Sequence, residues 1–438
     1  MTYFLSLFFL LLPTYLIRFN LGSLPTTLLE VMFWILTIFW VKKHKSTIIY
    51  NLLSIVKKQK LLFIGITLFL LAATISIFTS NNLRAALGEW KAFYIEPIIL
   101  FIIIITTFPK DNNAKTSKIS NFQFPISQFQ NFSPINIILF ALILSGLITS
   151  LLAIYQHFTG WLVPYVFWQN HNTFRVTAWY GFPNGVGLFL APIIPFIIYF
   201  IVKEWQKLKE KNWLLVISYL LSAICYLLAI IYSKGTGPLL GVLAGLGFLL
   251  VIYKKTRWFS LIIGLISLFS LLSFSSLSSL KNEIFFGDRS GQIRLQMWQD
   301  TFKFLGDHPL VGAGLASYSQ KIVPYHSQVN GENIEIFHHP HNILLTMYVN
   351  LGLLGLFSFI LIIYAYFKIL ITNYQLSITN KFSISQFQNF SIYLSASMIT
   401  MLVMGLVDSP YIKNDLAMFF WLLPALLIIN NQSQPTSV

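Results

Sequence analysis

The residues best suited to chemistry form one short segment, His338-His339-Pro340-His341-Asn342. Three His in four residues can bind a metal ion, but Pro340 interrupts helical i, i+4 geometry and no HExxH pattern is present. His can also act as a general base, because its unperturbed pKa lies near neutral pH. We take His341 as the first candidate base and His339 as the second. A packing role is the remaining alternative, with Asn342 as the N-cap of a following helix.

Basic residues elsewhere in the chain are candidates for binding an anion. In the stretch 287–306, Arg294 and Trp298 are four residues apart and apolar residues recur at helical spacing, which predicts one shared helix face. The alternative is an amphipathic helix resting on the membrane surface. Arginine is favoured for phosphate because its planar fork matches two oxygens. The other basic candidates are Arg289, Arg175 and Lys234. For Arg175 the alternative is a solvated loop charge, and for Lys234 it is a lysine that snorkels to the interface.

Two further features accompany these residues. Asp408, in Asp408-Ser409-Pro410, follows an apolar run and can pair with an Arg or a His, or simply terminate a helix. His308-Pro309 is expected to end the predicted helix, and Gly312 and Gly314 are expected to form a flexible turn after it. A lone GxG is weak evidence for phosphate binding.

The elements that position these residues follow from composition. The chain has 438 residues, of which 56% are hydrophobic and 10% charged, whereas soluble domains carry about 25% charged residues. Lipid must therefore solvate most of the surface. The net charge of +15 resides mainly in short clusters between apolar runs, a pattern typical of membrane topology that argues against a nucleic-acid partner. With Cys225 as the only cysteine, neither an intrachain disulfide nor a thiol metal site is expected.

Hydropathy predicts an all-α, polytopic membrane protein, because a span needs about 20 apolar residues. About twelve spans are expected, roughly at 2–18, 24–41, 61–79, 92–108, 135–157, 182–202, 213–232, 236–253, 258–280, 342–367, 392–408 and 415–430. Lysine density in the short loops places both termini in the cytoplasm and the long, partly helical loop 281–341 outside. Of the Arg residues after Arg18, only Arg257 is then inside. This asymmetry indicates an anionic ligand on the outer face.

Several local motifs, taken in order, resemble the O-antigen ligase and polymerase superfamily of bacterial membrane glycosyltransferases. They are Arg175 with Phe182-Pro183-Asn184, Ser233-Lys234-Gly235, Arg294-Leu-Gln-Met-Trp298 with Asp307-His308-Pro309-Leu310 and Gly312-Ala313-Gly314, His341-Asn342 with Gly352 and Gly355, and Asp408-Ser409-Pro410. The likeness is best over residues 170–425. It implies residues 1–160 as N-terminal transmembrane helices, 161–430 as the ligase-like region, and 431–438 as a cytoplasmic tail.

The resemblance implies transfer of a glycan from undecaprenyl diphosphate to an acceptor hydroxyl at the outer face of the cytoplasmic membrane. His341 matches the position proposed to take the acceptor proton, and Arg294 matches a diphosphate-binding Arg. Arg175, Lys234 and Arg289 would also hold the diphosphate, and Lys234 stands where the family usually has Arg. The secondary candidates are His339, His338, Asn342 and Asp408. No metal and no other cofactor is implied, because the lipid diphosphate is already activated.

Three other functions are consistent with the same sequence. A polymerase would join repeat units with the same motifs. A transporter of a lipid-linked glycan or an anion would place charges near the bilayer midplane, whereas here the polar residues gather on one face. A non-catalytic scaffold would tolerate loss of His341 and Arg294. The sequence identifies neither the sugar nor the acceptor, which can be a glycolipid, a polymer or a protein.

Overall fold

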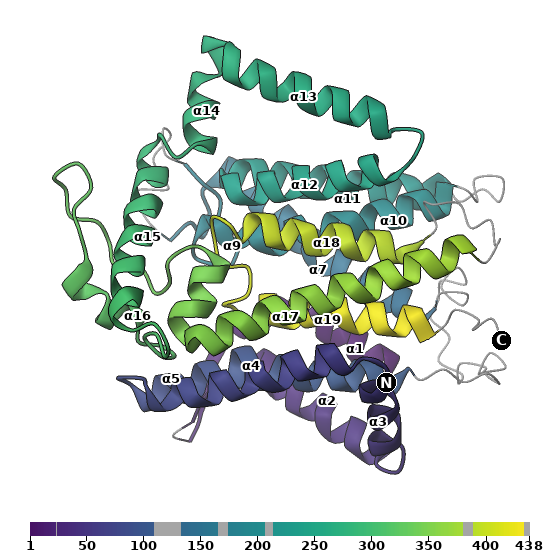
Figure 1. Ribbon diagram of the computed structural model, residues 1–438. Coiled ribbons are helices and arrows are strands. Elements are labelled where there is room, and N and C mark those ends of the chain that lie inside the picture. The colour runs from purple at the N-terminus through teal and green to yellow at the C-terminus, as the bar shows by residue number, and fades with distance from the viewer. Residues whose placement is uncertain (23, 109–132, 165–173, 206–212, 380–388, 433–438) are drawn as a thin grey trace.

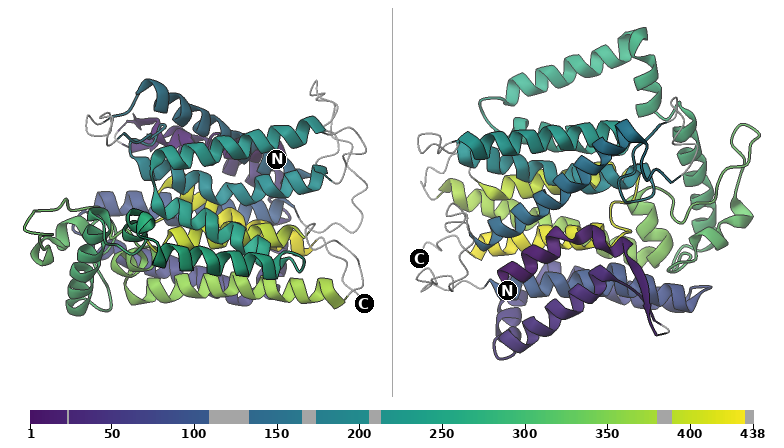
Figure 2. Two further views of the ribbon diagram at one scale, coloured as in Figure 1. Left: turned by 90° about the horizontal axis from the view of Figure 1, so that it is seen from above. Right: turned by 180° about the vertical axis from the view of Figure 1, so that it is seen from behind.

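A computed structural model describes residues 1–22, 24–108, 133–164, 174–205, 213–379 and 389–432. Most helices lie side by side in one bundle, and a group formed by α14, α15 and α16 covers one end of it (Figure 1). The two further views show this group beyond the same end of the bundle, with the first residues of the chain toward the opposite end (Figure 2). The side of a membrane that each end faces stays a prediction.

The described residues up to Thr159 are mostly helical and include one antiparallel hairpin, whose pairs run from Arg18 with Thr27 to Leu21 with Leu24. Their elements are α1 (Thr2–Leu10), the 3-10 helix η1 (Leu12–Leu16), β1 (Arg18–Leu21), β2 (Leu24–Thr27), α2 (Leu28–His44), α3 (Ile48–Lys58), α4 (Lys60–Phe78), α5 (Leu83–Glu89), the π-helical turn η2 (Trp90–Ile95), α6 (Glu96–Thr107) and α7 (Pro134–Thr159).

The described residues after Thr159 are also mostly helical. Their elements are α9 (Pro183–Leu190), η4 (Ala191–Ile193), α10 (Ile194–Trp205), α11 (Trp213–Ser233), α12 (Thr236–Ile252), α13 (Arg257–Ser273), η6 (Ser275–Leu277), α14 (Ser278–Ile284), α15 (Arg289–Asp307), α16 (Tyr318–Lys321), η7 (Val323–Tyr325), α17 (Ile343–Thr379), α18 (Phe390–Met404) and α19 (Asn414–Gln432). The all-α prediction is therefore confirmed apart from the hairpin. All but the first two residues of the predicted tail 431–438 lie outside the described residues.

Fewer helices than expected are long enough to span a membrane. Among the described residues, seven helices have the length and apolarity of a span, or eight if the pair bent by 92° after α13 counts as one. Two shorter apolar helices, α12 and α18, accompany them. The prediction of about twelve spans is not confirmed. The expected span 2–18 is interrupted after Leu10, because Pro13 opens a 3-10 helix and the chain then enters the hairpin.

Small residues bring helices α12 and α18 close together. Along α12, Gly237, Gly241 and Gly245 are spaced by four, which presents one glycine face. A Cβ at Gly245 would lie 2.2 Å from Thr400 Oγ1 of α18. This packing fixes the turn before α12 beside the turn that follows α18.

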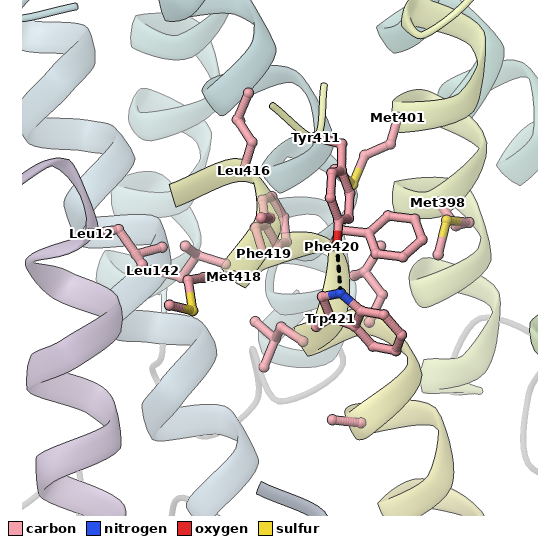
Figure 3. Close-up of a cluster of buried hydrophobic side chains, with 14 of the residues drawn as sticks. Leu12, Leu142, Met398, Met401, Tyr411, Leu416, Met418, Phe419, Phe420 and Trp421 are labelled. Carbon is pink, nitrogen blue, oxygen red and sulfur yellow. Dashed lines mark hydrogen bonds between the residues drawn. The ribbon is translucent and has the colours of Figure 1, made fainter. Parts of the chain in front are cut away.

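The turn after α18 is held by a buried aromatic cluster (Figure 3). Tyr411 donates its hydroxyl to the Phe93 carbonyl at 2.7 Å and accepts from Trp421 Nε1 at 3.0 Å. Phe420 packs edge-on against Tyr411, with the ring centroids 5.3 Å apart. Asp408, three residues before Tyr411, is thereby attached to a rigid support.

A kink in α17 receives the segment that follows α15. Gly352 has φ +69° and ψ −172°, a conformation that is essentially restricted to glycine. The interruption leaves the Leu353 amide free of its helical partner, and it donates to the Leu310 carbonyl at 3.0 Å. A Cβ at Gly352 would lie 2.2 Å from that carbonyl oxygen, and one at Gly312 would lie 2.5 Å from the Val349 carbonyl. The glycines are needed because two backbones meet here.

The same segment is also attached to α4 and α5. The Leu315 amide donates to the Ser76 carbonyl at 3.2 Å, and the Ala316 amide donates to Glu89 Oε2 at 2.9 Å. Gly314, with φ +81°, lets the chain turn against the end of α4. The helix expected in 287–306 is α15, and it ends at His308 as predicted. The segment that follows α15 is therefore docked on the bundle at α4, α5 and α17.

Candidate functional site

The candidate site is built around the turn between α18 and α19. Its first residues receive hydrogen bonds from the start of α17: the Ile343 amide donates to the Gly405 carbonyl at 2.7 Å, and Asn342 Nδ2 donates to the Leu406 carbonyl at 2.9 Å. Asn342 also caps α17, because its Oδ1 accepts from the Leu345 amide at 3.0 Å. The structural role predicted for Asn342 is thus present, and it joins the histidine segment to this turn.

Asp408 and His341 form a pair at the centre of the site. Asp408 Oδ1 lies 3.1 Å from His341 Nδ1 and accepts from the Ser409 amide at 2.8 Å. Asp408 Oδ2 accepts from Asn184 Nδ2 at 2.8 Å. Burial alone would raise the pKa of this carboxyl, but His341, His339 and the Ser409 amide together lower it well below its usual value. Asp408 is therefore an anion that holds the His341 ring by Nδ1 and leaves Nε2 for another partner.

His341 itself adopts a strained backbone conformation beside His339. Its φ is +47°, a left-handed value that residues other than glycine adopt uncommonly. The His341 amide donates to His339 Nδ1 at 3.4 Å, and the ring centroids are 4.6 Å apart. Burial, followed by the charge of His341, lowers the pKa of His339 to about 3. His339 is thus neutral near pH 7 and a weaker base than an ordinary His.

Arg175 joins the pair through a chain of hydrogen bonds. Its Nη2 donates to Asn184 Oδ1 at 3.0 Å, and Asn184 in turn donates to Asp408. Its Nε donates to the Ser233 carbonyl at 2.8 Å and its Nη2 also donates to the Lys234 carbonyl at 3.1 Å, which fixes the guanidinium against the turn before α12. Burial and the nearby Arg294 lower the pKa of Arg175 to about 10, so it is still a cation at neutral pH.

Arg294 reaches the same turn from α15. Its Nε donates to the carbonyl of Val407, the residue before Asp408, at 3.0 Å, and its Nη1 donates to Ser290 Oγ at 2.7 Å. Trp298, one helical turn further on, donates from Nε1 to the Pro340 carbonyl at 2.8 Å, which holds α15 against the histidine segment. Among the residues that the structure describes, neither Arg294 nor Arg175 forms an ion pair with a carboxylate. Both guanidinium charges are therefore available to an anion.

Three sequence candidates do not join this group in the same way. Arg289 pairs with Glu332 at 2.5 Å, and the two side chains are 70% and 60% exposed. Lys234 contributes its carbonyl to Arg175 and has φ +49°, while its side chain is exposed. His338 is also exposed. Solvent exposure is the one feature of these three side chains that favours their expected roles, which are binding of the diphosphate for Arg289 and Lys234 and replacement of the base for His338.

Two of the histidines and Asp408 lie close enough together that they could hold a metal ion. One ligand atom each from His339, His341 and Asp408 lies within 4.8 Å of the others. Three such ligands with one open position are typical of catalytic zinc. However, Asp408 Oδ1 already accepts from the Ser409 amide, and the neutral His339 faces the His341 backbone. A metal and a general base are therefore competing uses of the same atoms.

Two residues near the site had no role in the sequence analysis. Asn184, which bridges Arg175 and Asp408, was only part of a motif. Lys413 lies with its Nζ 4.3 Å from the centroid of the Phe182 ring, and its charge helps to lower the pKa of His339. Burial lowers the pKa of Lys413 as well. Its sequence signal is a cation directly before a span on the expected outer side.

These features define a multi-pass membrane protein with a His–Asp pair and two arginines at one end of its helices. Residues 221–360 match the protein family described as O-Antigen ligase. The predicted resemblance to the O-antigen ligase superfamily is thereby confirmed over these residues, which include Lys234, Arg294 and His341. Arg175 and Asp408 lie outside the matched segment, and the fold brings them to it. A comparison with curated proteins gave no match.

Proposed function

We propose that this protein transfers a glycan from a polyprenyl diphosphate to an acceptor hydroxyl at the membrane surface. The family match suggests activity of the O-antigen ligase or polymerase type. The structural observation that supports this reaction most directly is the continuous hydrogen-bonded chain Arg175–Asn184–Asp408–His341, with distances of 3.0, 2.8 and 3.1 Å. It links a cation suited to the leaving group with a base suited to the acceptor.

In the proposed reaction, His341 acts as general base. Asp408 holds the proton of the imidazole on Nδ1, so the lone pair of Nε2 can accept a proton from the acceptor hydroxyl. The acceptor oxygen forms a bond to the anomeric carbon of the glycan. The bond from that carbon to the diphosphate oxygen breaks, and its electron pair stays on the diphosphate. Asp408 then stabilises the imidazolium that results.

Arg175 and Arg294 would stabilise the leaving diphosphate. Charge develops on the diphosphate oxygens as the glycosidic bond breaks, and fixed cations lower the energy of that state. Arg175 and Arg294 are fixed by bonds to the backbone carbonyls of Ser233 and Val407, so they need little reorganisation. Lys234 can add a mobile point charge from its exposed position.

The proposed reaction uses no metal ion. The donor is already activated as a diphosphate, and the arginines supply the positive charge that a metal ion would otherwise provide. The chemistry also needs no nucleotide sugar. Ligase and polymerase reactions use the same groups and differ in the acceptor, which is the end of another glycan chain in a polymerase.

The test compares lipid-linked glycans in cells that carry the wild-type protein or His341→Ala at equal expression. His338→Ala is the matched control, because it removes an exposed imidazole three residues away. Accumulation of long lipid-linked chains in His341→Ala alone would indicate a ligase, and accumulation of single repeat units would indicate a polymerase. An unchanged pool together with unchanged surface glycan would refute the catalytic role of His341 and favour a transporter or scaffold.

A further inference from the structure

A second candidate site lies at the end of the bundle opposite to His341. A cavity of about 530 Å³ lies between the start of α4 and the distal part of α17. Four lysines line it, Lys57 and Lys58 at the end of α3, Lys60 at the start of α4, and Lys368 on α17. Leu62 and Ala365 are buried and contribute to its apolar wall. Basic and apolar groups thus face the same space.

The charges around this cavity are unbalanced. Its described lining contains four ammonium groups and neither Asp nor Glu. Like charges gathered around one partly enclosed space repel one another, and the repulsion is relieved when an anion enters. In the sequence these lysines serve as topology signals. Topology requires lysines in a loop, but it does not require them around one cavity.

Helix α3 shows where this cavity lies relative to the lipid. Ile49, Tyr50 and Leu53 are 70%, 78% and 54% exposed, whereas Ile55 faces the core. A short helix with exposed apolar side chains and terminal lysines lies in the plane of the membrane interface. Lys57 and Lys58 are then at headgroup depth. The apolar wall and this depth favour a phospholipid over a soluble phosphate compound.

We propose that this cavity binds the phosphate-bearing headgroup of an anionic phospholipid. Basic pockets between transmembrane helices on one face of a membrane bind lipids of this kind. Lys368 lies 25 residues beyond Ile343 on α17, which corresponds to roughly 37 Å of helix. Figures 1 and 2 place the α3–α4 connection and the distal part of α17 at the end of the bundle away from α15. The lipid site is thus separate from the proposed glycan site.

The test uses the purified full chain in a neutral detergent and measures binding of phosphatidylglycerol by native mass spectrometry. Detergent removes the charged bilayer surface, so general attraction of lysines to a membrane does not contribute. The pocket variant is Lys57→Gln/Lys58→Gln/Lys368→Gln. The matched control is Lys42→Gln/Lys43→Gln/Lys45→Gln, which removes three exposed lysines outside the cavity. Phosphatidylethanolamine and inorganic phosphate serve as comparison ligands.

Each lysine near an anionic headgroup contributes about a fivefold factor in affinity, so loss of three lysines should weaken the binding of phosphatidylglycerol by about 100-fold. The control variant should bind it like wild type, and phosphatidylethanolamine should bind all three proteins equally weakly. Equal losses in the pocket and control variants would overturn the proposal, because the lysines would then act only through net charge. Inorganic phosphate that displaces the lipid completely at equal concentration would also overturn it, in favour of a soluble anion.

Discussion

Replacing Asp408 with Asn removes one of the two carboxylate oxygens that accept hydrogen bonds in the site. The carboxylate accepts at Oδ1 from Ser409 and His341, and at Oδ2 from Asn184. Asn has a single acceptor oxygen, so it can satisfy only one side. With its oxygen toward His341, its amide group faces the Asn184 amide, which must turn and present its own NH2 to Arg175. With its oxygen toward Asn184, its amide group donates to His341 Nδ1.

Both arrangements lower activity, for different reasons. The first loses hydrogen bonds to a charged group, each worth about 1.5–3 kcal/mol. The second places the imidazole proton on Nε2, so that His341 can no longer take a proton from the acceptor, and general-base catalysis contributes about 10²–10⁴-fold. We therefore expect kcat to fall about 100-fold or more in Asp408→Asn, with a smaller change in the KM for the donor.

The assay follows glycan transfer by purified protein in liposomes that contain the lipid-linked donor. Asp408→Asn is compared with His341→Ala and with the double variant. If Asp408 acts through His341, the double variant is no slower than His341→Ala alone, because groups that act as a unit are not additive. Wild-type kcat in Asp408→Asn, or a double variant that shows the product of the two single losses, would refute this reasoning.

Four further predictions concern charge, backbone, pH and metal. Arg294→Gln should lower kcat/KM by about 30-fold, as expected for loss of a charge-assisted hydrogen bond of about 2 kcal/mol to the donor. Arg289→Gln removes an equal charge from an exposed ion pair and should change kcat/KM by no more than about twofold. Equal losses for the two variants in the same transfer assay would contradict the assignment of Arg294. Gly352→Ala should destabilise the protein by about 2 kcal/mol or more, because φ +69° is strained for Ala and its Cβ meets the Leu310 carbonyl; an unchanged thermal midpoint would show that the kink is not needed. The pKa of His339 is lowered to about 3 from 6.5, so its contribution to stability is full above pH 6.5 and is lost as pH falls from there toward 3, by at most about 1.4 kcal/mol per pH unit. His339→Gln should therefore flatten the fall in the thermal midpoint between about pH 7 and pH 5. A fall in the variant parallel to that of the wild type would exclude His339 as its source. EDTA should leave transfer unchanged; loss of transfer that zinc restores would establish a metal at His339, His341 and Asp408 instead.

The local features of the site were predictable from the sequence. Helical spacing located α15, and Asn342 has the side chain that N-caps require. The family likeness rested on short motifs within residues that the family match covers in part. Each of these signals depends on neighbours along the chain, which is why the sequence alone contains it.

The assembly of the site was not predictable in the same way. Asn184 and Asp408 are 224 residues apart and meet because α9, α12 and α18 pack at one end of the bundle. Hydropathy gives the number of apolar runs but not their neighbours in space. It also does not distinguish a span from a short helix followed by a hairpin, which is why the span expected at 2–18 failed. The direction of a side chain is equally hidden, as the exposed Arg289–Glu332 pair shows.

The most direct test of the central claim is release of polyprenyl diphosphate in a single turnover, with purified protein in liposomes and a labelled lipid-linked glycan. The wild-type protein should transfer the label to an added acceptor and release one polyprenyl diphosphate for each glycan transferred. His341→Ala should bind the donor as tightly as wild type and transfer it at least about 100-fold more slowly. Undiminished transfer by His341→Ala, or movement of the intact donor across the bilayer without release of diphosphate, would contradict the account.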